Sequence, residues 1–555
     1  MLKIFKMSKI PTLMAIFFLI TYAFVEILKA DVLGRIFDAT TKGTTTTFKE
    51  IAVMTVGFLA IYIIVKFLQN ITTLNAMYYI RYNLNKILFS SLLENNIEEF
   101  KKIETSFIIS KFNNDINILC EKFFLPVIRL FYLAVAFILG LIYIFRIDYR
   151  FLVFIFIILA ISFTYNKYHG DSLSKTQKQI TETQFRFINK LKSTFENFNI
   201  IKLYRTEKLE NNNFEVENIN ICRKIKNNEK LVRKMILFND TNGMILFLGI
   251  NVLGLYFILQ GTLTVGKLIA VIQASNYISN PLFAYSGLIN SINSTKLIRE
   301  EFKKLIDVKK KSLSTKEISL DKIDIKSLEY AYEDNKVLKK VSFSIEKNKK
   351  YALVGSSGSG KSTLLKILTK QLEEYKGSIK INHHELSEIN DENWFKMIKV
   401  VSQKNYFLVD SVKNNITMYK KYDPELFKKS LEIVDLLEVV NSLDDKEDYI
   451  ISEKNVKFSG GELQRINLAR ALYETPDILF LDETFSSLDN LLQQKIESRI
   501  LDKKDLTLFS ITHKLHRNIL KKYDEILVFK DGKLIEKGNY EYLIKTQGHF
   551  SSMIK

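Results

Sequence analysis

A glycine-rich loop offers the clearest chemistry in this sequence. The run Gly355-Ser356-Ser357-Gly358-Ser359-Gly360-Lys361-Ser362 follows the strand-like segment Tyr351–Val354 and opens an apolar helix at Thr363. Glycines allow backbone N–H groups to curl around phosphate oxygens, and the helix N-terminus adds a favourable dipole. We expect Lys361 to reach the β- and γ-phosphates of a nucleotide and the Ser362 hydroxyl to ligate Mg²⁺. A bare pattern of this kind can arise by chance, but the strand–loop–helix context favours a phosphate site.

Two adjacent carboxylates follow a second apolar strand. The run Ile478–Leu481 is typical of a buried parallel strand, and Asp482 and Glu483 come directly after it. The ends of such strands meet at the ligand edge of the sheet. We expect Asp482 to hold the Mg²⁺ shell and Glu483 to polarise the attacking water. The alternative is two solvated acids at a strand end, and the phosphate loop favours the catalytic interpretation.

A serine–glycine–glycine turn narrows the class of nucleotide hydrolase, because the first two features also fit kinases, helicases and small GTPases. The run Phe458-Ser459-Gly460-Gly461-Glu462-Leu463-Gln464-Arg465 resembles the signature of ATP-binding-cassette (ABC) proteins, usually Leu-Ser-Gly-Gly-Gln. Such a turn leading into a helix is a second anion cradle, although a plain helix-capping turn has the same sequence. In this family the turn faces the γ-phosphate held by the partner domain. The resemblance therefore implies ATP sandwiched between two subunits.

Further family elements follow in the usual order across 323–555. The resemblance implies that Tyr332 stacks on adenine, with Tyr330 as the second candidate, and that His513 is the switch histidine at the γ-phosphate. The predicted catalytic residues are Glu483, His513 and Gln403, and the predicted metal ligands are Ser362, Gln403 and Asp482. The predicted ATP-binding residues are Tyr332, Gly355, Ser356, Ser357, Gly358, Ser359, Gly360, Lys361, Ser362, Thr363, Ser459, Gly460, Gly461, Glu462 and Asp489.

The signature departs from the family pattern at two positions. Glu462 replaces the usual Gln, and Phe458 replaces the usual Leu. The charge of Glu462 either weakens nucleotide affinity or points away from the nucleotide. Because Glu483 and His513 are both present, the chain supports a consensus site. That favours a homodimer of half-transporters, although an active chain can also pair with a degenerate partner.

Short strands alternating with helices must position these residues. From about Ile323 the β-prone runs are Tyr351–Val354, Ile398–Val401, Ile478–Leu481, Thr507–Ile511 and Glu525–Phe529. This alternation predicts a mostly parallel sheet with ligand sites at the strand ends. We therefore predict an α/β P-loop ABC ATPase domain over 323–555, preceded by a linker over 311–322.

The first half of the chain has the composition of a membrane domain. A bilayer core of about 30 Å needs roughly 20 apolar residues in helical form. Six candidate spans over 1–310 satisfy this expectation: about 11–33, 51–69, 123–145, 151–167, 235–259 and 268–290. The long gaps at 69–122 and 167–234 hold almost no Gly or Pro, so they should continue the spans as helices beyond the membrane.

Charge sets the expected orientation and excludes some partners. The formal net charge is +19, but no compact block of Lys and Arg interleaved with aromatics predicts nucleic-acid binding. Basic residues concentrate in the second long gap, which places the gaps, the N-terminus and the nucleotide domain in the cytoplasm.

The N-terminal apolar run has no cleavage site and is interpreted as a retained first span. The two cysteines fit no metal spacing. We expect a multi-pass protein of the cell membrane.

Other segments resemble exporters in particular. Glu453 stands where family exporters place a glutamate that contacts intracellular loops, and Gln260–Leu268 resembles the connection before their last span. Segments near Ile103–Asp115 and Glu196–Arg205 resemble their two coupling regions. The resemblance implies ATP-driven efflux of an amphiphile by alternating access, with a peptide or drug-like cargo ranked before a lipid. An ATP-gated channel or a regulatory membrane subunit is the alternative.

The sequence contains few residues that indicate which substrate is transported. In the sixth span Gln273, Asn276, Asn280 and Tyr277 recur at helical spacing, so this polar stripe either lines a cavity or bonds neighbouring helices. In the first span Glu26 and Lys29 lie one turn apart, and a local ion pair is the favoured interpretation over contact with cargo.

Overall fold

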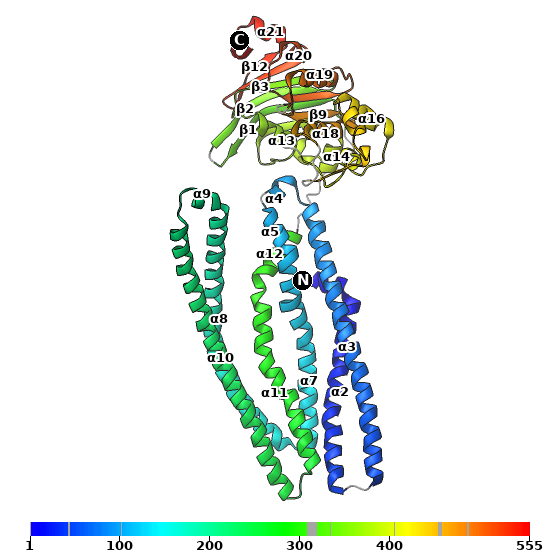
Figure 1. Ribbon diagram of the computed structural model, residues 1–555, viewed down its shortest axis with the longest axis vertical. Helices are drawn as coiled ribbons and strands as arrows, with labels where there is room; N and C mark the ends of the chain where they lie inside the picture. The colour runs from blue at the N-terminus through cyan, green and yellow to red at the C-terminus, as the bar shows by residue number, and fades with distance from the viewer. Residues whose placement is uncertain are drawn as a thin grey trace. The chain divides into compact units, whose positions relative to one another are not determined.

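The computed structural model describes residues 2–42, 45–101, 103–307, 319–333, 335–403, 406–452, 458–485 and 488–554 (Figure 1). The chain divides into two compact units. A helical unit comprises Met1–Glu94 and Glu104–Val308, and a nucleotide unit comprises Asn95–Ile103 and Lys309–Lys555. Most of the linker predicted over 311–322 lies outside the described residues.

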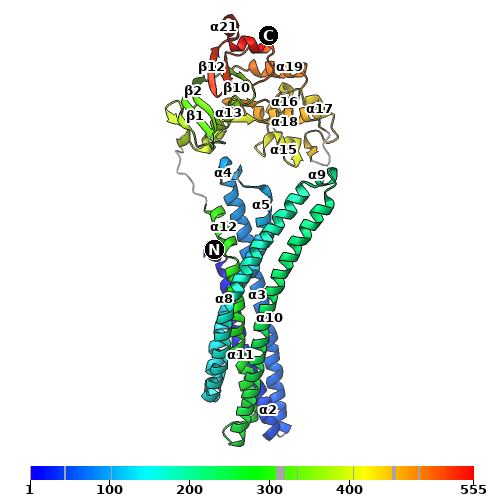
Figure 2. The same cartoon turned by 90° about the vertical axis from the view of Figure 1, so that its left-hand side faces the viewer.

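Six long helices build the helical unit, and each predicted span lies mostly or wholly within one of them. Their bounds are α2 Lys9–Lys42, α3 Thr45–Leu93, α7 Leu125–Ile147, α8 Tyr149–Glu196, α10 Glu207–Leu259 and α11 Val265–Ser294. The prediction that the long gaps continue as helix is confirmed for α3, α8 and α10. Helices α8 and α10 run side by side and are joined by the short helix α9 (Phe198–Leu203) (Figure 2).

Shorter elements complete this unit. They are α1 Leu2–Met7, α5 Thr105–Ser110, a π-helical turn at Lys111–Asp115, α6 Ile116–Leu119, a second π-helical turn at Cys120–Phe124 and α12 Lys296–Ile306. Buried Lys111 donates to Asp115 at 2.6 Å and to Glu301 on α12. This ion pair ties the segment before α7 to the last helix of the unit.

Among the described residues, five helical stretches are long and apolar enough to cross a membrane: Lys9–Thr40, Phe48–Leu93, Thr105–Ile147, Tyr149–Glu196 and Glu207–Leu259. Helix α11 is a continuous helix over the sixth predicted span, but it is not one of the five. Its polar residues Gln273, Asn276 and Asn280 lower its hydropathy. Five of the six predicted spans therefore have the length and apolar composition to cross a membrane, and the sixth, in α11, does not.

The structure separates the polar residues that sequence reasoning grouped together. The Tyr277 hydroxyl donates to the Glu26 backbone oxygen at 2.7 Å, so this member of the stripe bonds a neighbouring helix. Asn276 and Asn280 are exposed. The predicted ion pair of Glu26 with Lys29 is wrong: Lys29 is exposed, and the Glu26 carboxylate accepts from tyrosine hydroxyls instead.

Helices α2 and α11 approach closely at one end. A Cβ added to Gly266 would meet the Gly34 carbonyl oxygen at 2.0 Å, so only glycine permits this approach. The Asp38 carboxylate accepts from the Gly266 backbone N–H at 2.8 Å and from the Thr264 hydroxyl at 2.9 Å. Thr264 also caps α11 by accepting from Lys267 N–H. We call these contacts the Asp38 clasp.

A six-stranded sheet forms the centre of the nucleotide unit, in the order β12-β11-β3-β10-β9-β6. The five strands from β11 to β6 are parallel, as predicted, and β12 is antiparallel at one edge. Their bounds are β3 Lys350–Gly355, β6 Ile398–Val401, β9 Ile478–Asp482, β10 Thr507–Ile511, β11 Glu525–Lys530 and β12 Lys533–Gly538.

A second, antiparallel sheet was not predicted. Its order is β2-β1-β4-β5, with bounds β1 Lys322–Tyr332, β2 Asn335–Glu346, β4 Lys376–Ile381 and β5 His384–Glu385. A two-stranded pair joins β7 Asp410–Ser411 to β8 Ile450–Ile451. The helices are α13 Lys361–Leu368, α14 Asp391–Met397, α15 Val412–Thr417, α16 Pro424–Ile433, α17 Leu437–Asn441, α18 Gly460–Tyr473, α19 Asn490–Leu501, α20 Arg517–Leu520, α21 Tyr540–Lys545 and α22 His549–Ile554.

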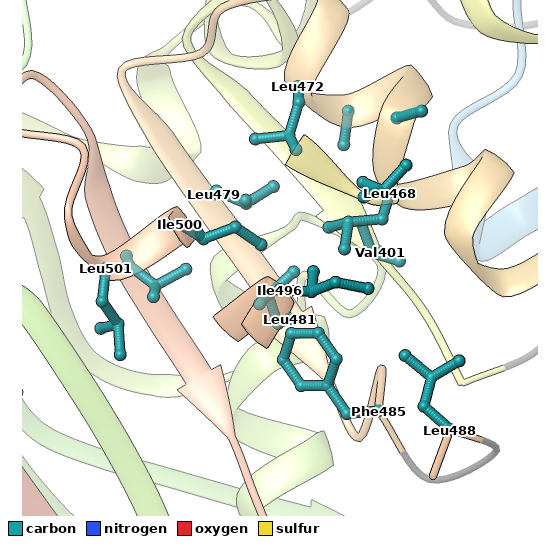
Figure 3. Close-up of a cluster of buried hydrophobic side chains, with 14 of the residues drawn as sticks. Val401, Leu468, Leu472, Leu479, Leu481, Phe485, Leu488, Ile496, Ile500 and Leu501 are labelled. Atoms are coloured by element: carbon teal, nitrogen blue, oxygen red, sulfur yellow. The ribbon is translucent and has the colours of Figure 1, made fainter. Parts of the chain in front are cut away.

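Strand β9 is fixed by apolar packing on both faces. Leu479 and Leu481 point into a cluster with Leu468 and Leu472 of α18 and with residues of α19 (Figure 3). Ile478 and Phe480, on the other face, join a second cluster with β3 and α13. Burying each such side chain contributes about 1.5–3 kcal/mol. This packing holds the residues that follow the strand in one place.

The segment Asn95–Ile103, which contains α4 (Ile97–Lys101), groups with the nucleotide unit. Asn96 Nδ2 donates to Glu373 Oε1 at 3.3 Å, the Glu373 backbone N–H donates to Glu98 Oε2 at 2.8 Å, and Lys101 bonds Gln371. Sequence resemblance suggested a first coupling region near Ile103–Asp115. These contacts lie earlier, because α3 ends at Leu93 and the chain turns there.

Candidate nucleotide site

The predicted phosphate loop joins β3 to α13. Strand β3 lies between β10 and β11, so the loop starts from the middle of the parallel sheet. Gly358 has φ +79° and Gly360 has φ +100°, and both values favour glycine strongly over other residues. Ser356 and Ser357 are exposed, whereas Ser359 and Thr363 are buried beneath the loop. The sequence thus folds into a loop whose backbone curls around the start of a helix.

Lys361 crosses this loop. Its side chain is buried, and Nζ donates to the carbonyl oxygens of Gly355 at 3.0 Å and Ser356 at 2.8 Å. Burial lowers the pKa of the Lys361 ammonium, and the charges of Glu483 and Asp482 act in the opposite direction. A partly desolvated ammonium at a helix N-terminus is well suited to hold phosphate oxygens.

Ser362 and Asp482 meet although they are far apart in sequence. The Ser362 hydroxyl on α13 donates to Asp482 Oδ1 at the end of β9, over 3.3 Å. Burial and the neighbouring Glu483 charge raise the pKa of the Asp482 carboxyl. A hydroxyl and a carboxylate oxygen at this spacing are the hard oxygen donors that Mg²⁺ prefers. These two residues fit the predicted metal. The amide nitrogen of Gln403, the third predicted ligand, bonds Glu483, and a metal role for this residue stays a prediction.

Glu483 is held between two neighbouring loops. Gln403 Nε2, after β6, donates to Glu483 Oε2 at 3.0 Å, and His513 Nε2, after β10, lies 2.8 Å from Oε1. The Glu483 backbone has φ +49°, a left-handed conformation that costs energy for a residue with a side chain. Its N–H donates to the Ile511 carbonyl oxygen. The structure therefore brings together all three residues predicted to be catalytic.

The serine–glycine–glycine turn caps α18. The Ser459 hydroxyl accepts from Glu462 N–H at 3.3 Å, and the Ser459 N–H donates to Glu462 Oε2 at 2.7 Å. This reciprocal capping box explains the acid at position 462, because Glu serves it as well as Gln. A Cβ at Gly460 would meet nothing within 4 Å, so packing within the chain does not require glycine there. Gly461 follows in the first turn of the same helix.

Two other residues predicted to contact the nucleotide are Tyr332 and Asp489. Tyr332 ends β1 with 43% of its surface exposed, while Tyr330 packs against the core and meets Tyr332 edge-on. Tyr332 is thus the ring available for stacking. Asp489 caps α19 by accepting from Leu492 N–H at 2.9 Å, which gives this carboxylate a structural role. Glu453, proposed from resemblance, lies outside the described residues.

Sequence reasoning missed two residues that hold the site. The buried Thr484 hydroxyl donates to the Val401 carbonyl oxygen at 3.2 Å and fastens the loop after β9 to β6. Lys514 Nζ donates to the Leu488 carbonyl oxygen at 3.1 Å and ties the loop after β10 to the loop before α19. Each directly follows a predicted catalytic residue in the sequence. That adjacency is the feature from which their role could have been predicted.

The loop, the paired acids and the parallel sheet define a P-loop nucleotide hydrolase with an added helical unit. Residues 338–486 match the family described as ABC transporter, and residues 12–282 match the ABC transporter transmembrane region. The multidrug resistance-like ATP-binding protein MdlA of Buchnera aphidicola subsp. Schizaphis graminum is 26% identical over 557 residues, which cover 97% of this chain and 94% of that protein.

Two further similarities are to a curated relative and to a solved structure. The ATP-dependent lipid A-core flippase of Pectobacterium atrosepticum is 30% identical over 300 residues, which are 53% of this chain and 51% of that protein. The structure of a bacterial Atm1-family ABC exporter with ATP bound superposes with a TM-score of 0.84 at 18% identity, over 98% of each chain. The chain belongs to the ABC transporter family, as an exporter that fuses a membrane domain to an ATP-hydrolysing domain.

Proposed function

We propose that this exporter moves an amphiphilic substrate out across the cytoplasmic membrane by alternating access in a dimer. A drug-like molecule or peptide ranks first and a lipid second. The similarity to a multidrug resistance-like protein and to a lipid A-core flippase supports this range. One observation supports ATP hydrolysis as the energy source. Glu483 is held between Gln403 and His513, beside the Ser362–Asp482 pair.

The geometry supports a division of labour in ATP hydrolysis. Lys361 and the loop N–H groups hold the phosphates, and Tyr332 stacks on adenine. Ser362 and Asp482 hold Mg²⁺, which supplies positive charge to the phosphate oxygens. Glu483 accepts a hydrogen bond from the attacking water and polarises it, while Gln403 and His513 fix the carboxylate. To donate to the γ-phosphate, as the family resemblance implies, His513 Nε2 would exchange its contact with Glu483 Oε1 for one with the nucleotide.

A second half-transporter completes this proposal. The open space at Gly460 and the exposed turn before α18 support contact with nucleotide held by another chain. The paired helices α8 and α10 also carry exposed apolar side chains that a partner would cover: Phe185, Ile188, Phe195, Leu209 and Val216. A homodimer is favoured, because one chain holds both Glu483 and His513. The basic residues of α8 and α10 support a cytoplasmic nucleotide unit.

Transport into inverted membrane vesicles tests the proposal. We expect ATP-dependent uptake of an amphiphile against its gradient, and we expect Glu483→Gln to abolish it. Uptake that only follows the gradient when ATP binds would favour an ATP-gated channel. Transport by a partner that continues unchanged with Glu483→Gln would favour a regulatory subunit. Thr546→Ala, far from the site in sequence and on the last turns of the chain, is the matched control.

A further inference from the structure

A glutamate in the first membrane-spanning helix is surrounded by tyrosines. Glu26 on α2 accepts hydrogen bonds from the hydroxyls of Tyr22 on the same helix, of Tyr62 on α3 at 3.2 Å and of Tyr277 on α11 at 3.0 Å. Three helices therefore supply donors to one carboxylate. Tyr62 and Tyr277 are far from Glu26 in the sequence, so only the packing of the helices brings them to it.

A cation of the chain already lies on this cluster. Lys66 Nζ on α3 stands 4.1 Å from the centre of the Tyr22 ring. Among the described residues Lys66 makes no ion pair with Glu26, so the ammonium is held by the aromatic face. An electron-rich ring face attracts cations, and the attraction grows where water is excluded. We call Tyr22, Glu26, Tyr62, Lys66 and Tyr277 the Glu26 cluster.

Among the described residues the recorded partners of the Glu26 carboxylate are hydroxyl donors, and none is an ammonium or guanidinium within ion-pair distance. Hydroxyl donors stabilise a carboxylate, but a charge within a membrane-spanning helix is costly unless an opposite charge faces it. Glu26, Tyr62 and Tyr277 are only partly buried, so the cluster is not sealed within the helical unit of this chain. A carboxylate flanked by tyrosine faces is the chemistry that recognises an organic ammonium or phosphonium group.

We propose that the Glu26 cluster binds the cationic head of an amphiphilic substrate, which competes with Lys66 for the Tyr22 face. This inference rests on the proposed export function and specifies its substrate class. The cationic head lies on the tyrosine rings beside Glu26, and the apolar part of the substrate contacts the surrounding helices. Glu26 supplies charge selectivity, and Lys66 lowers affinity by occupying the same face.

Direct binding to the full chain in lipid nanodiscs tests this, without requiring ATP hydrolysis. The probes are tetraphenylphosphonium, which is cationic, tetraphenylsilane, which is neutral and of similar shape, and tetraphenylborate, which is anionic. Glu26→Gln keeps the acceptor oxygen but removes the charge. We expect it to weaken tetraphenylphosphonium binding about tenfold, or about 1.4 kcal/mol, and to leave tetraphenylsilane unchanged. Lys66→Met should tighten tetraphenylphosphonium binding severalfold.

Matched controls separate charge recognition from structure. Lys29→Gln, at an exposed position one turn from Glu26, should leave all three affinities unchanged. Equal losses for cationic and neutral probes, with a lower melting temperature, would assign the cluster to helix bonding and overturn the proposal. The reverse charge pattern, in which Lys66→Met weakens tetraphenylborate and Glu26→Gln tightens it, would assign an anionic substrate instead. Transport that fails for every probe while binding stays cation-selective would contradict only the export function.

Discussion

The two units of this protein arrange their polar residues in opposite ways. In the nucleotide unit, Lys361, Asp482 and Glu483 belong to short continuous motifs at the ends of parallel strands. In the helical unit, Glu26 meets Tyr62 and Tyr277 only because separate helices pack together. The first arrangement is local and suited to one ligand. The second depends on the relative positions of helices, and those positions can change during transport.

This difference predicts two kinds of mutational effect. Changes in the nucleotide unit remove the energy source, so they should affect every substrate equally. Changes in the Glu26 cluster should alter the ranking of substrates by charge. The predictions below, in order of expected size, test that distinction.

The largest effect is expected for Lys361→Ala. Loss of the ammonium that crosses the phosphate loop should weaken ATP binding by on the order of a hundredfold, because a charge-assisted contact to phosphate disappears. Equilibrium binding of a fluorescent ATP analogue measures this. Lys366→Ala, one turn further along α13 and exposed, is the control. Unchanged affinity in Lys361→Ala would remove the phosphate loop from the site.

Glu483→Gln should lower kcat by up to about a hundredfold while ATP still binds. The amide keeps an oxygen for His513 or Gln403 but is a far weaker base. Steady-state ATPase assays with several substrates provide the measurement, and the loss should be the same for each. Rapid turnover in this variant would show that another group polarises the water. A loss that varied with substrate charge would contradict the separation of the two units.

Tyr277→Phe should produce an intermediate and selective effect. It removes hydrogen bonds to Glu26 but keeps the ring, and one such bond contributes about 1 kcal/mol. We expect severalfold weaker stimulation of ATPase activity by cationic amphiphiles and little change for neutral ones. Dose–response curves for matched probes measure the shift. Tyr285→Phe, at an exposed position on the same helix, serves for comparison.

Glu462→Gln and Glu462→Ala should differ, although both remove the charge. Gln keeps the capping box of α18, so the ATPase rate and melting temperature should stay close to those of the parent chain. Ala removes the side-chain acceptor from Ser459 N–H and should cost about 1 kcal/mol of stability. Thermal unfolding of both variants tests this. If Gln raised ATP affinity strongly, the charge of Glu462 would face the nucleotide.

The smallest effect is expected for Glu497→Gln in α19. Burial raises the pKa of the Glu497 carboxyl, so the folded state binds its proton more tightly than the unfolded state does. The contribution of this group to stability therefore falls as pH rises from the ordinary Glu range through the raised folded pKa. The Glu497 carboxylate accepts from Gln493 Nε2 at 3.2 Å. Gln493 Oε1 is a buried atom with no partner among the described residues, and an amide at position 497 gains it as an acceptor once the Gln493 amide turns over.

Melting temperatures across pH test this expectation. Glu497→Gln should be slightly more stable than the parent chain near neutral pH, and the difference should shrink in acid, where the parent carboxyl is protonated in both states. A variant that lost stability at neutral pH would show that the Tyr523 hydroxyl, 2.7 Å from Glu497 Oε1, requires the charge.

Sequence alone predicted the parallel strands and the meeting of Ser362, Asp482, Glu483, Gln403 and His513 well. Apolar runs of four or five residues define those strands, and parallel pairing brings their ends to one edge. The antiparallel sheet around β1 escaped prediction, because its strands alternate apolar and charged residues and contain several register shifts. Their pattern resembles that of exposed loops.

The helical unit was predicted only in outline. Hydropathy located the helices, but not their packing partners. Glu26 and Lys29 are correctly spaced for an ion pair, yet the rotation of α2 against α3 and α11 turns Glu26 towards tyrosines and leaves Lys29 exposed. Such rotations are set by tertiary packing, for which this sequence offers no local signal.

The Asp38 clasp has a mechanical consequence. Helices α2 and α11 are fastened at the end where Gly34 meets Gly266, so this end should act as the pivot of a hinge between the two helices. Any opening between them would grow with distance from that pivot, and a small angular change would be magnified further along the pair. Glu26 on α2 and Tyr277 on α11 lie away from the pivot. The distance between these two residues would therefore report how far the helices have separated.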